Sequence, residues 1–391
     1  MKIIELKPFD NKIEKEFLYL PLKIYKNDKN YILPLYKDIK TVFTPSKNPC
    51  FNFGEAKRWI LQDDNQQTIG RIAAFYDKRI INVGNEQPTG AMGFFECIDN
   101  QEAANLLFDT CKEWLISKGM EAMDGPINFG DRGKWWGLLV DGFHQPNYQS
   151  NYNPPYYRHL LENYGFKDYF QQYTFARALH RGQLTPTFVE KSERLMKNPS
   201  YRFEHIQKKN IEKYVNDFRD VYNQSWAKRE GVAQMTEAES RKLLKEMQPI
   251  IHEKIIWFAY YDGLPIGFVV MIPELNQYFK YVNGKMNLWG KLKFLYHFKT
   301  KKVKKILGVI IAVVPRFQKF GLESALLVRL SESMAEKESP YEMGEFNWVG
   351  DFLPVMVRFY ESFGCDIYKT HITYRKLFDE TKEFKRHPIV K

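Results

Sequence analysis

The sequence predicts a mixed α/β (α+β) protein with a mixed sheet, made of two copies of one fold. Its 391 residues are enough for two domains. Apolar residues alternate between the two-residue spacing of strands and the three-to-four-residue spacing of helices. Segments with these spacings follow a similar order on both sides of a stretch punctuated by Gly and Pro at 181–200. We therefore expect an N-terminal domain at 1–180, a linker at 181–200 and a C-terminal domain at 201–391.

The first half begins with a helical pattern over about 12–26. Two strands follow at Arg58–Asp63 and Thr68–Asp77, joined by a short polar turn, and a third follows at Ala91–Ile98. Glu102–Ser117 has apolar side chains at helical spacing and is expected to form an amphipathic helix. The first half is thus predicted to place a helix, three strands and a second helix in succession.

The second half has a similar order of elements. A hairpin is expected to turn at Asp262-Gly263, because this pair favours the two-residue turns of β-hairpins. The other predicted elements, in chain order, are a strand at 201–206, helices at about 210–225 and 236–247, a strand at 306–314, a helix from 321 to about 337, a strand at 344–349, a helix from about 352 to 362, and strands to the C-terminus.

The composition indicates a globular protein with anionic partners. Hydrophobic residues make up 44% and charged residues 27% of the chain, and 58 Lys and Arg against 47 Asp and Glu give a net charge of +11. Such a surplus favours nucleic acid, a phosphate-bearing cofactor, an acidic carrier protein or a membrane surface.

Several features limit the location and the cofactors. The N-terminus has no signal-peptide pattern, and the longest apolar run, 306–315, is too short for the roughly 20 residues of a transmembrane helix. The four cysteines are scattered, and the histidines show no metal-ligand spacing. We expect a cytoplasmic protein without a transmembrane segment or a metal.

A strand, a short loop and a helix at 306–327 form the segment with the clearest chemistry. The helix N-terminus and the backbone N–H groups before it would converge on one point, which suits a diphosphate. An ordinary strand–loop–helix connection would have the same pattern, and both interpretations stay open on this feature alone. The residues expected to bind the cofactor are Val313, Val314, Arg316, Gln318, Lys319, Phe320, Gly321 and Leu322.

This segment resembles the signature of the GNAT superfamily of acyl-CoA-dependent N-acyltransferases. The family pattern Gln/Arg-x-x-Gly-x-Gly/Ala is matched at its first four positions by Gln318-Lys-Phe-Gly321, with Val-Val-Pro before it and Ser-Ala-Leu-Leu after it. Glu323 departs from the pattern at the last position. The resemblance implies the acyl-CoA N-acyltransferase fold, with acetyl-CoA or a longer acyl-CoA as co-substrate. It also implies oxyanion stabilisation by backbone N–H groups near Ala312–Val314.

The resemblance also points to a catalytic tyrosine. Family members often carry Tyr-x-x-x-Gly-Phe, and Tyr360 to Gly364 fits this pattern with Cys365 in place of Phe. A phenol within hydrogen-bond reach of the sulfur can protonate a leaving thiolate. Leu353 stands where the family usually has Asn. Core packing is the alternative role for Tyr360.

The first half lacks the signature and instead has a long loop rich in Gly, Asn and aromatic residues. Ordered loops of this length usually have a function. The loop could wall a substrate pocket or pack between the domains, and the two interpretations are held equal. The residues expected at a substrate are Asn128, Trp135, Trp136, Asp141, Tyr152, Asn153 and Tyr156.

Four motifs in the first half are similar to those of a bacterial family of tandem GNAT proteins typical of the Bacteroidetes group. They are Gly70–Ala73 (GRIA), Gly93–Glu96 (GFFE), Gly125–Asn128 (GPIN) and Tyr152–Tyr157 (YNPPYY). Together with the signature they extend the resemblance over nearly the whole chain.

A basic tract at 291–305 contains seven lysines and no acidic residue. A short amphipathic helix is plausible there. The tract could be a solvated excursion, or it could attract the CoA 3′-phosphate, an acyl-carrier protein or anionic lipid. Its position just before the cofactor strand favours the first two ligands. Nucleic acid is disfavoured, because no nucleic-acid-binding module is recognisable.

The sequence thus predicts a transfer of an acyl group from acyl-CoA to an amine acceptor, either a small molecule or a peptide. Two alternatives remain open at this point. One is a non-catalytic GNAT-fold binding protein, favoured by the departures at Glu323 and Leu353. The other is a transferase that uses aminoacyl-tRNA as the donor.

Overall fold

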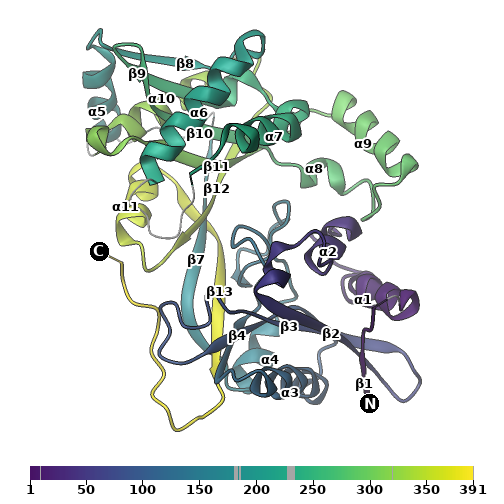
Figure 1. Cartoon of the computed structure of the whole chain (residues 1–391). Helices are drawn as coiled ribbons and strands as arrows, with labels where there is room; N and C mark the ends of the chain where they lie inside the picture. The colour runs from purple at the N-terminus through teal and green to yellow at the C-terminus, as the bar shows by residue number, and fades with distance from the viewer. Residues whose placement is uncertain (9, 180–183, 185, 227–233, 319, 391) are drawn as a thin grey trace.

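The structure is a computed structural model that describes all residues except 9, 180–183, 185, 227–233, 319 and 391. Within these residues, thirteen strands form one mixed sheet (Figure 1). Twelve strands lie in the order β1-β2-β3-β4-β5-β13-β7-β12-β11-β10-β9-β8, and β6 pairs with β13 beside this path. The predicted mixed α/β class is confirmed.

The first half supplies strands β1 to β7 and helices α1 to α4. Its elements are β1 (Lys2–Glu5), α1 (Asn11–Ile24), α2 (Tyr36–Val42), β2 (Gly54–Gln62), β3 (Thr68–Asp77), β4 (Thr89–Cys97), α3 (Gln101–Ser117), β5 (Ala122–Gly125), β6 (Leu138–Asp141), α4 (Tyr157–Asn163) and β7 (Lys167–Ala178).

The second half supplies the remaining elements. They are α5 (Pro186–Met196), β8 (Tyr201–His205), α6 (Ile211–Trp226), α7 (Glu237–Met247), β9 (Ile256–Tyr261), β10 (Leu264–Pro273), α8 (Asn276–Phe279), α9 (Leu288–Thr300), β11 (Lys305–Val313), α10 (Leu322–Ala335), β12 (Met343–Gly350), α11 (Pro354–Ser362) and β13 (Asp366–Leu377). The turn between β9 and β10 has positive φ at both Asp262 and Gly263, which the predicted two-residue hairpin requires.

The two halves exchange their last strands. β13, from the end of the chain, lies between β5 and β7, and β7, from the first half, pairs with β12 (Figure 1). Representative partners are Tyr374 with Gly125 and Phe346 with Phe175. The halves therefore share one sheet, and the predicted boundary between separate domains stays a prediction.

Residues 181–200 were expected to form a linker. Within them, Pro186–Met196 forms helix α5. Phe188, Ser192 and Leu195 recur at helical spacing and are buried. The ring of Phe188 packs on Phe359 and Phe363 near α11, with centroid separations of 6.0 and 5.1 Å. This burial explains why a segment punctuated by Pro and Gly still forms a helix.

A buried charge cluster ties the halves together beside β12. Glu345 is fully buried and accepts a hydrogen bond of 2.9 Å from the Lys369 ammonium on β13. It is also paired with Lys305 on β11, and the Asn147 amide of the first half donates to it at 2.6 Å. Burial alone would raise the pKa of Glu345, but the two ammonium groups hold that pKa below its usual value.

None of the described helices has both the length and the apolar content to cross a membrane. No three His, Cys, Asp or Glu side chains in the described part of the chain come together to hold a metal ion.

Candidate active site

The strands β11 and β12 separate after a short parallel pairing. They pair from Lys305 with Met343 to Gly308 with Phe346. β11 continues to Val313 beside β10 alone, and Val309 is an extra residue between the pairs Val270–Ile310 and Met271–Gly308. The edge of β11 that faces β12 is therefore unpaired beyond Gly308.

The backbone of β11 offers hydrogen-bonding groups to this gap. The N–H of Val314 donates to the carbonyl of Ile266 at 2.9 Å. Because bonding alternates along an antiparallel pair, the N–H groups of Ile311 and Val313 point away from β10 and toward the gap. Of the expected oxyanion donors near Ala312–Val314, Val313 thus keeps an available N–H, whereas that of Val314 is used in the ladder.

The loop after β11 leads to the N-terminus of α10. Gly321 precedes this helix with φ of 91° and provides no side-chain cap, so the first-turn N–H groups are open to an acceptor, apart from that of Glu323, which the Glu323 carboxylate itself accepts. The Gln318 amide donates to the Val313 carbonyl at 2.9 Å and holds the loop to the strand. A Cβ on Gly321 would lie 3.4 Å from that of Lys191, so α5 runs close to this turn.

The predicted cofactor residues take different positions around this loop. Val313, Val314 and Leu322 are buried and build the frame, whereas Arg316 and Phe320 are exposed. Lys319 lies outside the described residues. Glu323, the departure from the family pattern, is half-buried in the first turn of α10, and burial raises the pKa of its carboxyl.

Tyr360 stands over the point where β11 and β12 separate. Its ring lies 5.3 Å from those of Phe175 on β7 and Phe346 on β12, and Phe346 belongs to the last β11–β12 pair. The side chain is 8% exposed, and burial, with a smaller effect of Cys365, raises the pKa of its hydroxyl. The phenol is therefore neutral at physiological pH and can serve as a proton donor.

A small polar cavity lies on the other face of the sheet at the same level. Thr174 and Asn347 follow or precede Phe175 and Phe346 by one residue, so their side chains point to the opposite face. The Thr174 hydroxyl donates to the side-chain amide oxygen of Asn347 at 3.3 Å. The cavity measures about 20 Å³, and its wall includes Trp135, Trp136, Gln172, Trp348 and His371.

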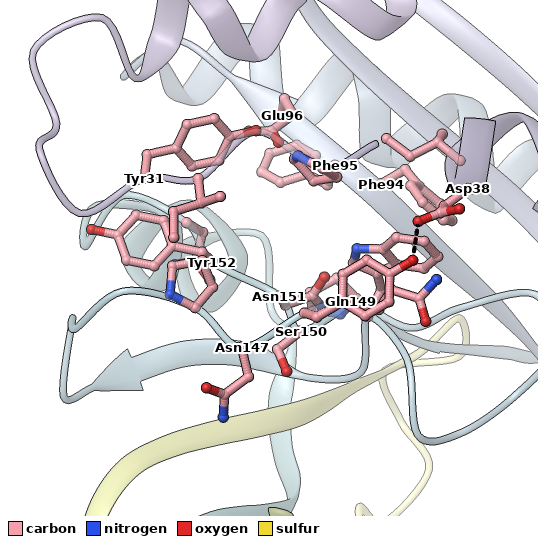
Figure 2. A pocket seen from close by; sticks show the side chains of 18 of the residues that line it. Tyr31, Asp38, Phe94, Phe95, Glu96, Asn147, Gln149, Ser150, Asn151 and Tyr152 are labelled. Atoms are coloured by element: carbon pink, nitrogen blue, oxygen red, sulfur yellow. Dashed lines mark hydrogen bonds between the residues drawn. The ribbon is translucent and has the colours of Figure 1, made fainter. Parts of the chain in front are cut away.

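A larger pocket adjoins this cavity in the first half (Figure 2). It measures about 60 Å³ and lies between the segment 31–39, the strands β3 and β4, and the loop 146–153. The two cavities share Trp135 and Ser150 in their walls. In Figure 2, Tyr31 and Tyr152 stand on one side of the pocket, and Phe94 and Asp38 stand on the other.

A buried carboxylate closes one wall of the larger pocket. Glu96 on β4 pairs with Arg71 on β3 at 3.2 Å. It also accepts hydrogen bonds from the hydroxyls of Tyr25, at 2.8 Å, and Tyr157, at 2.9 Å. Burial raises the pKa of Glu96, while Arg71 opposes this shift. The wall therefore holds a buried carboxylate whose charge is balanced by Arg71 and whose oxygens accept two hydroxyls.

The structure brings together some of the predicted substrate residues and separates others. Trp135, Tyr152 and Asn153 line the larger pocket, and Trp136 lines the small cavity. Asn153 uses its amide to bind the backbone of Leu139.

Three predicted substrate residues do not line either cavity. The Asn128 amide donates to the Asp131 carbonyl, Asp141 is exposed at the end of β6, and the Tyr156 hydroxyl donates to the carbonyl of Cys97. The polar groups of Asn128 and Tyr156 therefore bind backbone carbonyls, and that of Asp141 faces solvent.

The sequence interpretation missed Arg71, Glu96, Tyr31, Tyr148 and Asn276 as pocket residues. Two of them lay within the quoted GRIA and GFFE motifs. A charged residue at an inward position of an otherwise apolar strand was the available signal. Asn276 comes from the second half and could be found only from the fold.

An apolar groove lies beside the bulge in β11. It measures about 150 Å³ and lies between α6, α7 and the strands β9 to β11. Val309 and Ile310 form part of its wall, together with Phe218, Leu244 and Phe258. The groove thus begins where β11 loses its second partner and offers an almost wholly apolar surface.

The chain is similar to two curated proteins, whereas no protein-family model matches it. It is 27% identical to the bacterial ceramide synthase of Caulobacter vibrioides over 369 residues, which cover 93% of this chain and 94% of the relative. It is 23% identical to protein YghO of Escherichia coli over 367 residues, which cover 93% of this chain and 92% of that protein.

Solved structures resemble the whole chain at low sequence identity. A tandem GNAT protein from the clavulanic acid biosynthesis pathway matches with a TM-score of 0.53 and 10% identity, covering 96% of this chain and 98% of that one. A glucosamine N-acetyltransferase region of a fungal β-N-acetylglucosaminidase matches with a TM-score of 0.51 and 10% identity, covering 96% of this chain and 38% of that one. The narrower Bacteroidetes-type assignment stays a prediction. The predicted fold is confirmed: the chain has the tandem GNAT fold.

Proposed function

We propose that the chain is an N-acyltransferase that moves a fatty acyl group from acyl-CoA to the amine of a long-chain lipid. The observation that carries the proposal is the opening between β11 and β12, with Tyr360 on one face of the sheet and the polar cavities on the other. A thioester placed in this opening would have a proton donor on one side and an amine pocket on the other.

The second half suits the donor. The pantetheine arm of CoA carries amides, and one of their carbonyl oxygens can accept a hydrogen bond from the Val313 N–H on the strand edge that faces the gap. The uncapped N-terminus of α10 after Gly321 suits the diphosphate. The apolar groove beside Val309 suits a fatty acyl chain rather than an acetyl group.

The first half suits the acceptor. Its pocket combines tyrosine and tryptophan rings with the Glu96 carboxylate and adjoins the small cavity at Asn347. The curated relative from Caulobacter vibrioides is named a ceramide synthase. A ceramide is the amide of a fatty acid and a long-chain amino alcohol, so that name supports the same bond and the same two substrate classes.

The proposed reaction transfers the acyl group and moves one proton from the amine to the sulfur. The amine nitrogen forms a bond to the acyl carbonyl carbon, and the carbon–sulfur bond breaks. The Ile311 N–H, the edge donor nearer the opening, stabilises the charge on the carbonyl oxygen, and Tyr360 gives a proton to the departing sulfur. The phenol regains the proton that the amine loses.

A direct assay tests this function. The purified protein is mixed with palmitoyl-CoA and sphinganine, free CoA is measured with a thiol reagent, and the amide is identified by mass spectrometry. Acetyl-CoA and ethanolamine serve as short-chain controls. We expect CoA release to require both long-chain substrates. Calorimetry that detects neither palmitoyl-CoA nor CoA binding to the folded protein would overturn the proposal, and binding without turnover would favour the non-catalytic alternative.

A further inference from the structure

Helix α9 lies at the periphery of the molecule (Figure 1). Phe294 lies 5.3 Å from Phe279 and 5.8 Å from Tyr278, and Phe298 lies 5.2 Å from Tyr278. Because α8 follows β10 directly, these rings fix α9 to the second half. The opposite face of α9 is turned away from these contacts.

That opposite face is apolar and exposed. Its residues recur at helical spacing over two turns, and we call them the apolar face of α9. They are Leu288 (71% exposed), Trp289 (72%), Leu292 (49%), Leu295 (49%) and Tyr296 (64%). Soluble proteins seldom expose so many large apolar side chains together unless the patch meets a partner.

The net charge of the chain is concentrated in the segment that contains α9. Residues 275–322 contain eleven Lys and Arg and no Asp or Glu. The rest of the chain then holds 47 basic residues, which is 58 less 11, against 47 acidic ones, and is neutral overall. At 100° per residue, Lys291 and Lys293 flank the apolar face of α9 on its two sides, and Lys299 lies near its C-terminal end.

A cleft leads inward from α9. It measures about 550 Å³ and lies between α9 and α1, with Trp289, Tyr19 and Leu22 in its wall. The cleft and the acceptor pocket are separated by one segment of chain. Leu33 and Tyr36 of this segment line the cleft, and Ile32 and Leu35 line the pocket.

We propose that α9 docks the protein on the surface of an anionic lipid bilayer. The apolar face of α9 enters the boundary between headgroups and acyl chains, and the flanking lysines bind lipid phosphates while their stems remain in the apolar layer. An acidic protein would satisfy the lysines, but a row of Leu, Trp and Tyr between them fits the layered polarity of a bilayer better. The basic tract is thereby assigned to lipid rather than to the CoA phosphate or a carrier protein.

Docking would also set the direction of substrate entry, and this part rests on the proposed function. A lipid amine leaving the bilayer at α9 would meet the cleft beside Trp289 and Leu22 and then the acceptor pocket. The docking itself needs neither substrate.

Vesicle co-sedimentation tests the docking. The full chain is mixed with vesicles of phosphatidylcholine alone or with about one third phosphatidylglycerol, at low and high salt and without substrates. We expect binding to the anionic vesicles that weakens at high salt. The double variant Trp289→Glu with Leu292→Glu should lose at least tenfold in partitioning. As a matched control, Ile80→Glu with Val83→Glu changes two side chains that are 56% and 71% exposed in the first half and should bind as the wild type does.

Circular dichroism and the thermal midpoint confirm that the variants are folded. Equal binding of wild type to neutral and anionic vesicles, or undiminished binding of the α9 variant, would overturn the proposal. Binding of acyl-carrier protein in place of vesicles would also overturn it and would assign the face to a protein. Activity on substrates dispersed in detergent, measured in parallel, reports the proposed function separately, because it requires no bilayer.

Discussion

Each half has a pair of parallel strands that separates after a few residues, and the two halves differ in what lies beyond the pairing. In the first half, β4 and β5 pair in parallel from Thr89 with Ala122 to Ala91 with Asp124. The chain after β5 then lies directly against β4, because the Ile127 N–H donates to the carbonyl of Met92 at 2.9 Å. A Cβ on Gly93 would lie 1.9 Å from the Ile127 oxygen. In the second half, β11 has no such cover beyond Gly308.

The helices that follow β4 and β11 also differ, in whether a side chain caps the helix N-terminus. The side chain of Asn100 caps α3 by accepting the Ala103 N–H at 2.8 Å. Gly321 leaves the N-terminus of α10 without a side-chain cap. Four residues before the glycine at the end of the last helix, the first half has Leu161 and the second has Tyr360. One half therefore covers the strand edge and caps the helix, whereas the other leaves both open.

The two copies of the fold thus differ in the features that they keep. The closed half keeps a polar pocket on the face that carries α1 and α2, and the open half keeps a strand edge, a helix N-terminus and an apolar groove.

The largest expected effect is on turnover. Tyr360→Phe removes the proposed acid and should lower kcat by about 10³-fold with little change in KM for acyl-CoA, since a general acid contributes roughly 10²–10⁴-fold. Tyr164→Phe is the control, because the Tyr164 hydroxyl contacts only Asp109 among the hydrogen bonds of the described residues, in the first half. Equal kcat values for wild type and Tyr360→Phe would leave Tyr360 a packing residue.

The next largest expected effect is on stability, at the buried charge cluster that joins the two halves. Glu345→Gln leaves Lys305 and Lys369 without their shared carboxylate and should lower the free energy of unfolding by about 3 kcal/mol. The pKa of Glu345 is depressed in the folded state, so its contribution is present above the ordinary glutamate pKa and is lost as the pH falls below it. Urea unfolding should therefore show wild type and variant converging in acid. Glu86→Gln, which loses only an exposed pair with Lys385, should behave as wild type at every pH.

The open helix N-terminus predicts a change in affinity. Gly321→Ala strains a residue at φ of 91° and places a methyl group against Lys191, so the Kd for CoA should rise about tenfold, equal to about 1.4 kcal/mol. Gly119→Ala imposes similar strain at φ of 80° with no neighbour within 4 Å, in the closed half. Calorimetry should show weaker CoA binding only for the first variant; the same loss for both would indicate strain alone.

The smallest expected effect comes from the acidic residue beside that N-terminus. Glu323→Gln removes a negative charge near the proposed diphosphate site and should tighten CoA binding about threefold at pH 8, roughly 0.7 kcal/mol. Because burial raises the pKa of Glu323, the wild-type carboxyl takes up its proton at a higher pH than usual. The ratio of the two Kd values should thus approach one as the pH falls. Glu332→Gln, an exposed change further along α10, should leave the ratio at one throughout.

Most elements could be predicted because their side chains carry the spacing of a strand or helix within a single segment. Thr68–Asp77 and α3 are examples, each with a nearly continuous buried face. Helix α5 was missed because the local Pro and Gly indicate a loop. Its apolar residues are buried only by packing against α10 and α11, which are distant in the sequence. Nor does any local pattern indicate that β13 pairs with β5 rather than with its own half.

The candidate site shows the same limit. The aromatic loop was expected near a substrate, and Trp135 and Tyr152 do line the pocket. The pairing of Arg71 with Glu96 depends on the register between β3 and β4, which places these two residues opposite each other. A sequence pattern gives the identity of such residues but not their register, so the charged wall of the pocket could not be predicted.

The exchanged strands have a consequence for how the chain is made. β5 ends at Gly125, and its partner β13 runs from Asp366 to Leu377, so about 250 residues are synthesised between the two. During translation, the edge of β5 that pairs with β13 stays unpaired until β13 leaves the ribosome. Such distant pairing slows folding and exposes edges to other chains. We therefore expect that the first half alone, residues 1–180, will aggregate when expressed and that a β13 segment supplied separately will rescue its solubility.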